Sequence, residues 1–287
     1  MRTPTVNKTM RIDSHQHFWK RELGYYNWLT EDMGAIYKDF SPEDLRPSLK
    51  KSGIDKTILI QAAADTAETE YMLSLAQSTD FIVAVIGWID MQSTDAPSQL
   101  AKLSRHSYFK GIRPMIQDIH DDNWMLKKEL EPAFNCLMQL GLCFDALVKP
   151  RHLKALLTVA KRYPKLKIVI DHAAKPDIAG NKAEQWAEDI QAFSGLDNVY
   201  CKLSGLVTEA GHNPDFNNLI PYMQHLLDTF GTGRLMWGSD WPVLNLATDY
   251  QQWVSLTKAF LSNVEENQQA QIWSKNAIKF YNLTIVD

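Results

Sequence analysis

Three histidines and one aspartate of this chain have side chains that bind divalent metals or activate water. His15 and His17 lie at the end of one strand-like run, His172 at the end of a second and Asp240 at the end of a third. Imidazole nitrogens and carboxylate oxygens are ordinary ligands of Zn²⁺, and a carboxylate can also take a proton from water. Because these residues are far apart in sequence, only a fold that gathers strand ends at one face can unite them. Together they predict a hydrolytic active site.

The spacing of His15 and His17 places both imidazoles on one side of the chain, because side chains in an extended segment repeat every two residues. Both rings can then bind one metal ion, or one ring can bind the metal while the other meets a substrate. Asp13 lies on the same face, where it either orients an imidazole or serves as a hydrogen-bonded core carboxylate.

His172 and Asp240 each follow an apolar run directly. His172 comes after Asp171, and this polar pair should emerge at the mouth of a barrel. Asp240 stands in the sequence Gly-Ser-Asp-Trp-Pro, whose small residues let the backbone turn tightly after the strand. The alternative is that the two aspartates cap the following elements and that His172 has no chemical role. We expect Asp240 to be a general base for a hydrolytic water.

Two cationic residues, Arg113 and Lys202, also fall at strand ends. A cation inside a mostly apolar barrel is costly unless it is paired. Either residue could pair with Asp145 or Asp171, or could bind a carbonyl oxygen that becomes negative during attack. Ser204 is a further candidate for a hydrogen bond to substrate.

The segment 18–40 is too long to be a simple connection after the first strand, and it is rich in aromatic residues. Long loops in compact domains are commonly functional lids. We expect Trp19 and Trp28 to contact a ring-shaped ligand, with packing of the loop as the alternative role for each.

Short apolar runs alternate with amphipathic stretches, as in repeated βα units. Ser41 and Pro42 begin one helix that ends at Gly53, and Gly141 ends another. Eight candidate strands are expected, the number of a closed α/β barrel of the (β/α)8 or TIM type. They cover residues 10–13, 57–61, 82–88, 110–113, 143–147, 167–171, 199–203 and 235–238.

Composition excludes several other classes of protein. The chain has 287 residues, a formal charge of −4 and 45% hydrophobic residues, and no apolar stretch is long enough to cross a bilayer. Its acidic balance argues against a nucleic-acid partner. The three cysteines are expected to be buried free thiols in a reducing cytoplasm. No secretory signal is apparent, so we expect a tail over residues 1–9 and one domain over 10–287.

Several segments of the chain form a recognisable set of motifs in a fixed order. They lie at residues 12–19, 39–45, 61–63, 87–90, 110–114, 170–176, 198–209, 235–243, 276–277 and 280–281. With these motifs the chain resembles the lactonase group within the amidohydrolase superfamily, in its amidohydrolase-2 branch. Members hydrolyse sugar-acid lactones such as L-fuconolactone and L-rhamnonolactone, and related members act on pyrone or muconolactone substrates. The resemblance covers residues 10–283 and is more specific for the group than for one substrate.

The resemblance implies a carboxylic ester hydrolase that opens a small-molecule lactone, such as L-fucono-1,5-lactone, on an amidohydrolase-type barrel. Asp240 would activate water, while the three histidines position that water or polarise the carbonyl. Arg113 and Lys202 would stabilise the oxyanion or hold substrate oxygens. The aromatic wall of the ring site would come from Trp19, Trp28 and Trp241.

The resemblance also predicts how many metal ions the site can hold. Binuclear members of the superfamily carry a carboxylated lysine or a glutamate after the fourth strand and a histidine after the fifth, whereas this chain has Arg113 and Asp145 there. We therefore expect His15, His17, His172 and Asp240 to hold at most one divalent ion such as Zn²⁺. Lactonase relatives also include enzymes that work without a required metal.

Two other functions share this pattern. Metal-dependent decarboxylases of the superfamily have the same histidines and aspartate, and a non-catalytic sugar-acid binding protein could derive from the enzyme. A hydrolase of a non-sugar lactone is a third alternative. The sequence does not choose among individual lactones, nor between a monomer and a homo-oligomer.

Overall fold

The computed structural model of the chain describes residues 9–211 and 214–285. Eight parallel strands follow one another in the order β1 to β8, each hydrogen-bonded to the next. The circle closes where His17 N donates to Trp241 O and Asp240 N donates to His15 O, both at 2.8 Å. The expected (β/α)8 barrel is therefore confirmed, while the tail expected over 1–9 lies outside the described residues except for residue 9.

The strands occupy the eight expected places. They are β1 (Ile12–Gln16), β2 (Lys56–Ile60), β3 (Ile82–Gly87), β4 (Phe109–Ile112), β5 (Cys143–Ala146), β6 (Lys167–Ile170), β7 (Val199–Leu203) and β8 (Leu235–Trp237).

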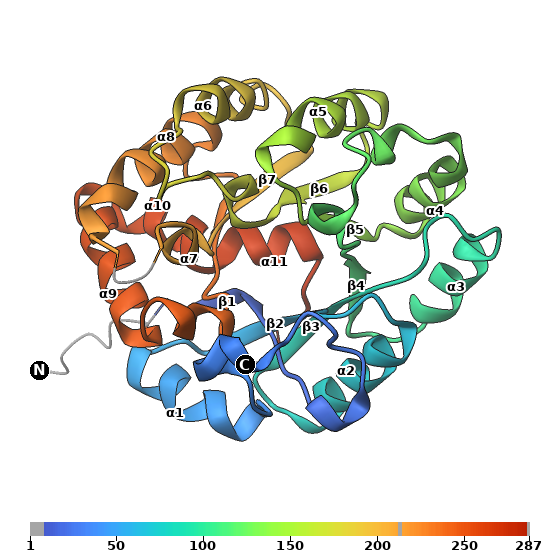
Figure 1. Cartoon of the computed structure of the whole chain (residues 1–287), viewed down its shortest axis with the longest axis horizontal. Helices are drawn as coiled ribbons and strands as arrows, with labels where there is room; N and C mark the ends of the chain where they lie inside the picture. The colour runs from blue at the N-terminus through green and yellow to red at the C-terminus, as the bar shows by residue number, and fades with distance from the viewer. Residues whose placement is uncertain (1–8, 212–213, 286–287) are drawn as a thin grey trace, which may run out of the picture.

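Helices surround this barrel on the outside (Figure 1). The first begins at a capping box made by Ser41 and Asp44 and ends at Gly53, which has a φ of 70°. The α-helices are α1 (Pro42–Ser52), α2 (Thr66–Ser78), α3 (Ala96–Leu103), α4 (Glu131–Leu140), α5 (Leu153–Arg162), α6 (Glu184–Gln191), α7 (Leu206–Glu209), α8 (Ile220–Phe230), α9 (Tyr250–Phe260), α10 (Glu266–Ala270) and α11 (Asn276–Tyr281).

Strand β1 runs further than expected, so that His15 lies within the strand and not after it. The polar residues after Asp13 stay in the sheet because their side chains find partners in the barrel. Ser14 Oγ donates to Trp237 O at 2.7 Å, and Gln16 Nε2 donates to Thr57 Oγ1 at 3.1 Å. These hydrogen bonds extend the strand beyond the apolar run from which it was predicted.

The short helix α11 crosses the barrel at the amino-terminal ends of the strands (Figure 1). It packs against inward-facing strand residues that include Ile12 and Cys143, and Phe280 O lies 3.3 Å from Cys143 Sγ. Its last residue reaches further in, because Tyr281 Oη donates to Asp145 Oδ2 at 2.7 Å. The helix therefore closes one end of the barrel and leaves the other end to the site.

A buried cation lies between two buried carboxylates above α11. Lys202 Nζ is 2.6 Å from Asp145 Oδ2 and 3.0 Å from Asp171 Oδ1, and none of the three side chains is exposed. Burial raises the pKa of Asp145 to about 6. Burial also opposes ionisation of Asp171, but Lys202 and His15 hold its pKa well below the usual range.

The cysteines are buried and free, as expected: Cys136, Cys143 and Cys201. Among the described helices, none is both long and apolar enough to cross a bilayer.

Replacing Lys202 with methionine should destabilise the fold strongly. The variant leaves two buried carboxylates without their cation, and loss of one partner of a buried ion pair typically costs about 3–5 kcal/mol. Urea unfolding followed by circular dichroism would measure the loss. Lys182→Met serves as a matched control, because Lys182 forms an exposed ion pair with Asp177.

The double variant Lys202→Met/Asp145→Asn should unfold at a higher urea concentration than Lys202→Met alone, because it removes one of the two stranded charges. Equal midpoints for Lys202→Met and the Lys182→Met control would contradict this account of the barrel centre.

Candidate active site

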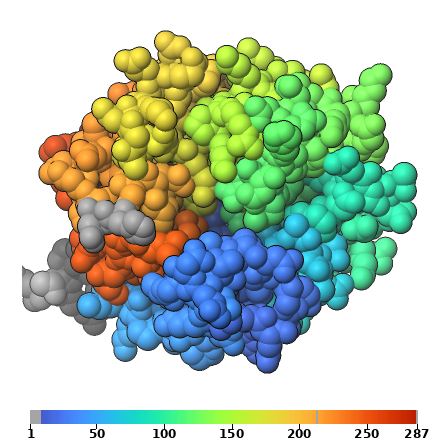
Figure 2. Space-filling model, in the orientation of Figure 1, coloured from blue at the N-terminus to red at the C-terminus, as the bar shows by residue number. Residues whose placement is uncertain are grey.

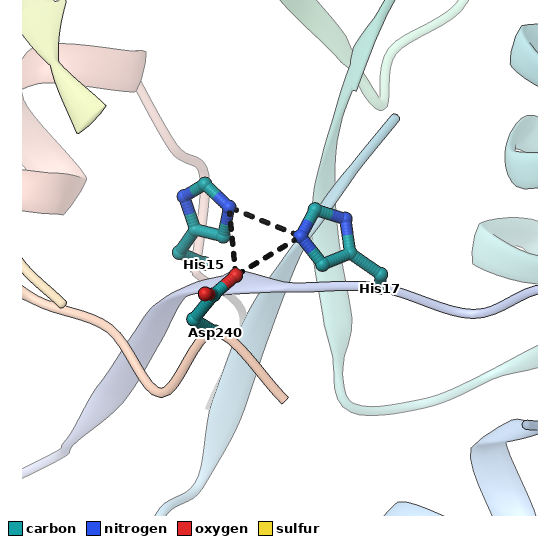
Figure 3. A group of neighbouring side chains, drawn as sticks. All are labelled: His15, His17 and Asp240. Atoms are coloured by element: carbon teal, nitrogen blue, oxygen red, sulfur yellow. Dashed lines mark hydrogen bonds and ion pairs between the residues drawn. The ribbon is translucent and has the colours of Figure 1, made fainter. Parts of the chain in front are cut away.

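The barrel brings together the side chains of His15, His17 and Asp240 at the carboxyl ends of β1 and β8 (Figure 3). His17 Nε2 lies 3.2 Å from His15 Nε2 and 3.3 Å from Asp240 Oδ1. His15 Nε2 and His172 Nε2 each lie 3.6 Å from the same oxygen. Three histidines, up to 225 positions away in sequence, thus converge on one oxygen of Asp240.

The ring of His17 is fixed by the neighbouring strand. Its Nδ1 lies 2.8 Å from Ile60 O, and a carbonyl oxygen can only accept a hydrogen bond, so Nδ1 carries the proton. In the neutral ring, Nε2 is then unprotonated and presents a lone pair to His15 and Asp240.

His172 is positioned by an unusual backbone and by a small neighbour. Its φ is 52°, in the left-handed region. Its Nδ1 lies 2.9 Å from Ser204 Oγ, which directs Nε2 toward Asp240. Gly205 permits this placement, because a Cβ there would lie 2.5 Å from His172 Nδ1.

Asp240 is aimed inward by the turn that follows β8. Its φ is 59°, and the preceding Ser239 N donates to Asp13 Oδ1 at 2.8 Å. Asp13 also accepts a hydrogen bond from Tyr250 Oη at 2.9 Å. Asp13 is therefore a hydrogen-bonded carboxylate that joins β1 to the turn carrying Asp240, and it lies outside the group of converging ring nitrogens.

Burial and charge determine the protonation of the site. Burial lowers the pKa of His15 well below the imidazole range and lowers that of His172 to about 4. Burial likewise lowers the pKa of His17. Burial opposes ionisation of Asp240, but the imidazoles of His172, His17 and His15 hold the pKa of its carboxyl below the usual range. At neutral pH the site therefore contains neutral rings and an ionised carboxylate.

This donor set fits one divalent metal ion. The separations of 3.2, 3.3 and 3.6 Å among His15 Nε2, His17 Nε2 and Asp240 Oδ1 match the roughly 3.3 Å edge of a tetrahedron with zinc-ligand bonds of about 2.0–2.1 Å. The neutral tautomer of His17 adds an available lone pair. Among the described residues, two groups could hold a metal ion, one made by His15, His17 and Asp240 and the other by His15, Asp171 and His172.

A pocket of about 330 Å³ opens above these side chains. In Figure 2 this face is hollowed near its centre, between the blue, green, yellow and orange parts of the chain. Its lining comes from the ends of several strands and their loops: His17, Trp28, Met33, Ile36, Ala62, Arg113, Met115, Gln117, Asp118, Leu147, His172, Lys175, Asp240, Val243 and Leu246.

Arg113 reaches the pocket from the end of β4 and is held from several sides. Its NH1 lies 3.5 Å from Asp171 Oδ2 and 3.4 Å from His15 Nε2, and its NH2 donates to Gln61 O. The guanidinium is thus fixed beside the cluster of ring nitrogens.

The aromatic residues expected to contact ligand fall into two groups. Trp28 lines the pocket and is held by a 2.7 Å hydrogen bond from Nε1 to Ala62 O. Trp19 is fully buried and packs edge-on against Trp28 and Phe40, while Trp241 packs against Phe40. Trp19 and Trp241 therefore support the loop behind the pocket lining.

Two other expected substrate contacts lie beneath the pocket. Lys202 adopts the alternative role of pairing with Asp145 and Asp171, because a side chain within β7 points to the sealed barrel interior. Ser204 contacts His172 and has no exposed surface. In this structure each reaches the pocket only through a histidine, since Lys202 Nζ also lies 3.2 Å from His15 Nδ1.

Sequence reasoning missed several polar residues of the pocket, namely Gln117, Asp118 and Lys175. Lys175 stands three residues after His172. This spacing places both side chains in the pocket only because of the tight turn between them, which the sequence does not reveal. Gln117 and Asp118 lie beyond β4 in a segment with no apolar periodicity.

Comparison with known proteins agrees with the geometry. The Amidohydrolase family model matches residues 12–283. A Burkholderia ambifaria protein named L-fucono-1,5-lactonase is 46% identical over 279 residues, covering 96% of each chain. A Burkholderia multivorans protein of the same name is 32% identical over 286 residues, again with 96% of each covered.

Solved structures show the same likeness. A crystal structure of a Burkholderia multivorans amidohydrolase with bound zinc superposes with a TM-score of 0.91 at 32% identity, covering 96% of this chain and all of that one. The family match and these full-length relatives agree with the barrel fold and with the histidines that converge on Asp240. The chain belongs to the amidohydrolase family.

Proposed function

We propose that this protein is a lactonase that hydrolyses a sugar-acid lactone, with L-fucono-1,5-lactone as the first candidate substrate. One observation carries the proposal: the buried Asp240 carboxylate faces three imidazoles at the floor of a pocket that can hold a six-membered ring. The two full-length Burkholderia relatives named L-fucono-1,5-lactonase support the choice of substrate.

Asp240 acts as the general base in this proposal. Its Oδ1 makes the contacts with His15, His17 and His172, whereas Oδ2 has no hydrogen-bonding partner in the described part of the chain. Oδ2 can therefore accept a proton from a water molecule that attacks the lactone carbonyl. The protonated carboxyl then returns the proton to the leaving ring oxygen, so one water adds across one ester bond.

Arg113 stabilises the negative charge that develops on the carbonyl oxygen. Its guanidinium is only 3% exposed, is fixed by Gln61 O and Asp171, and lies beside His15 at the pocket floor. A preorganised cation in a water-poor site acts more strongly on a developing oxyanion than it would in water. Trp28 forms one wall of the ring site above it.

We further propose that His15, His17, His172 and Asp240 can hold one divalent ion, with zinc as the candidate. Such an ion, when bound, would act as a Lewis acid toward the carbonyl or lower the pKa of the attacking water.

A panel of lactones tests the function directly. Turnover would be followed with a pH indicator on L-fucono-1,5-lactone, other aldonolactones and a pyrone dicarboxylate lactone, with and without a chelator, and with metal analysis of the same samples. Hydrolysis of an aldonolactone above the spontaneous rate supports the proposal. Turnover confined to the pyrone lactone, or none on the whole panel, would overturn it.

Replacing Asp240 with asparagine should reduce kcat by about 10³-fold or more, because the isosteric amide cannot take a proton from water. Steady-state assays on L-fucono-1,5-lactone would measure the loss, and circular dichroism would check that the variant is folded. Activity within about tenfold of wild type would remove Asp240 from the role of general base.

The acid limb of the pH profile should lie at unusually low pH. Since the pKa of His172 is lowered to about 4 and that of Asp240 lies below the usual carboxyl range, both groups stay deprotonated well below neutrality. We expect kcat/KM, corrected for spontaneous hydrolysis, to be flat between about pH 6 and 8 and to fall only below about pH 5. A midpoint near the ordinary imidazole pKa of about 6.5 would contradict these protonation states.

A further inference from the structure

The loop after β6 contains a run of left-handed backbone. His172, Ala173, Ala174 and Lys175 have φ values of 52°, 54°, 61° and 53°, and none of them is glycine. Left-handed backbone is strained for residues other than glycine. Hydrogen bonds hold the turn closed: Lys175 N donates to His172 O at 2.8 Å, and Trp186 Nε1 donates to Ala173 O at 2.7 Å.

This turn brings two functional groups into one pocket. His172 and Lys175 both line it, together with Asp240. Lys175 and Arg113 are the lysine and arginine residues among the described pocket lining, and the side chain of Lys175 is 22% exposed whereas that of Arg113 is 4% exposed.

Glu209 fixes the position of the Lys175 ammonium. Its Oε1 lies 3.3 Å from Lys175 Nζ, and its backbone oxygen accepts a hydrogen bond from Ala179 N at 3.1 Å. An ion pair with both partners partly exposed contributes little to the stability of a protein. The consequence of the pair is instead to hold the ammonium in one place at the lining of the pocket.

The ammonium keeps donors available for a ligand. A lysine has three N–H groups, and Glu209 is its one hydrogen-bonding or ionic partner in the part of the chain that the structure describes. An available donor beside a carboxylate acceptor suits hydroxyl groups, because each hydroxyl both donates and accepts.

We propose that Lys175 donates a hydrogen bond to a ring hydroxyl of the substrate and selects hydroxylated lactones, with Glu209 as its positioning residue. This inference rests on the proposed lactonase function. The bound lactone is neutral, so the interaction acts as a hydrogen bond from a charged donor and not as charge neutralisation.

The test compares a hydroxylated ring with a bare one. L-Fucono-1,5-lactone and δ-valerolactone share the six-membered lactone, but only the first carries ring hydroxyls. Lys175→Met should raise KM for the fuconolactone by about 10–100-fold, the equivalent of about 1.5–3 kcal/mol for a hydrogen bond to a charged group. Its kcat should change far less, and its constants for δ-valerolactone, measured as KM or as an inhibition constant, should be unchanged.

Three further variants sharpen the comparison. Lys175→Arg keeps a cationic donor and should recover part of the affinity, and Glu209→Gln should raise KM by less than Lys175→Met. Lys182→Met removes an exposed lysine from the same loop and should behave as wild type. Urea midpoints would show that each variant is folded.

Two results would overturn the inference. An unchanged KM for the fuconolactone in Lys175→Met excludes the contact, and an equal loss of kcat on both lactones would place Lys175 at the carbonyl instead. If wild type turns over neither lactone, the proposed function fails on its own. Calorimetric titration of the same lactones into wild type and Lys175→Met then decides the inference, and equal affinities would overturn it.

Discussion

The ammonium group of Lys202 connects the two ends of the barrel. Its Nζ donates to Asp145 Oδ2 at 2.6 Å, forms an ion pair with Asp171 Oδ1 at 3.0 Å and lies 3.2 Å from His15 Nδ1, so it has three buried partners. Asp145 is held from below by Tyr281 of the closing helix. The orientation of the central histidine therefore depends on a chain of contacts that begins at the opposite end of the molecule.

The buried charge of Lys202 also determines the charges of the groups at the floor of the pocket. Asp171 keeps its negative charge because Lys202 and Arg113 flank it, and Arg113 is in turn held beside His15. Lys202 also disfavours a proton on His15, so the site keeps a neutral ring next to an ionised Asp240. The pocket above is therefore lined by the Asp240 carboxylate, the Arg113 guanidinium and uncharged imidazole rings.

Much of this architecture could be predicted from the sequence, because the signals are local. Apolar runs marked eight strands, and Gly53 and Gly141 marked helix ends where the backbone is left-handed. The three histidines and Asp240 could be predicted because residue types that bind metals recur at or near the ends of strands. These signals lie in the order of residue types along the chain and do not depend on the direction in which a long side chain points in the folded protein.

The remaining features depend on three-dimensional context. Lys202 and Arg113 looked alike in sequence, yet one lies sealed between carboxylates and the other reaches the pocket. Trp19 and Trp28 share one loop, but only Trp28 lines the pocket, because Trp19 supports it from behind. Lys175 could not be foreseen because its position depends on a left-handed turn that contains no glycine.

The central claim is that Asp240 activates water and never becomes bonded to the acyl carbon. A single turnover of L-fucono-1,5-lactone with excess enzyme in H₂¹⁸O, followed by mass spectrometry of the product and of the peptide carrying Asp240, tests it directly. General-base attack predicts one ¹⁸O in the product carboxylate and none in the peptide. An unlabelled product carboxylate with ¹⁸O in Asp240 would show a covalent acyl intermediate and contradict the claim.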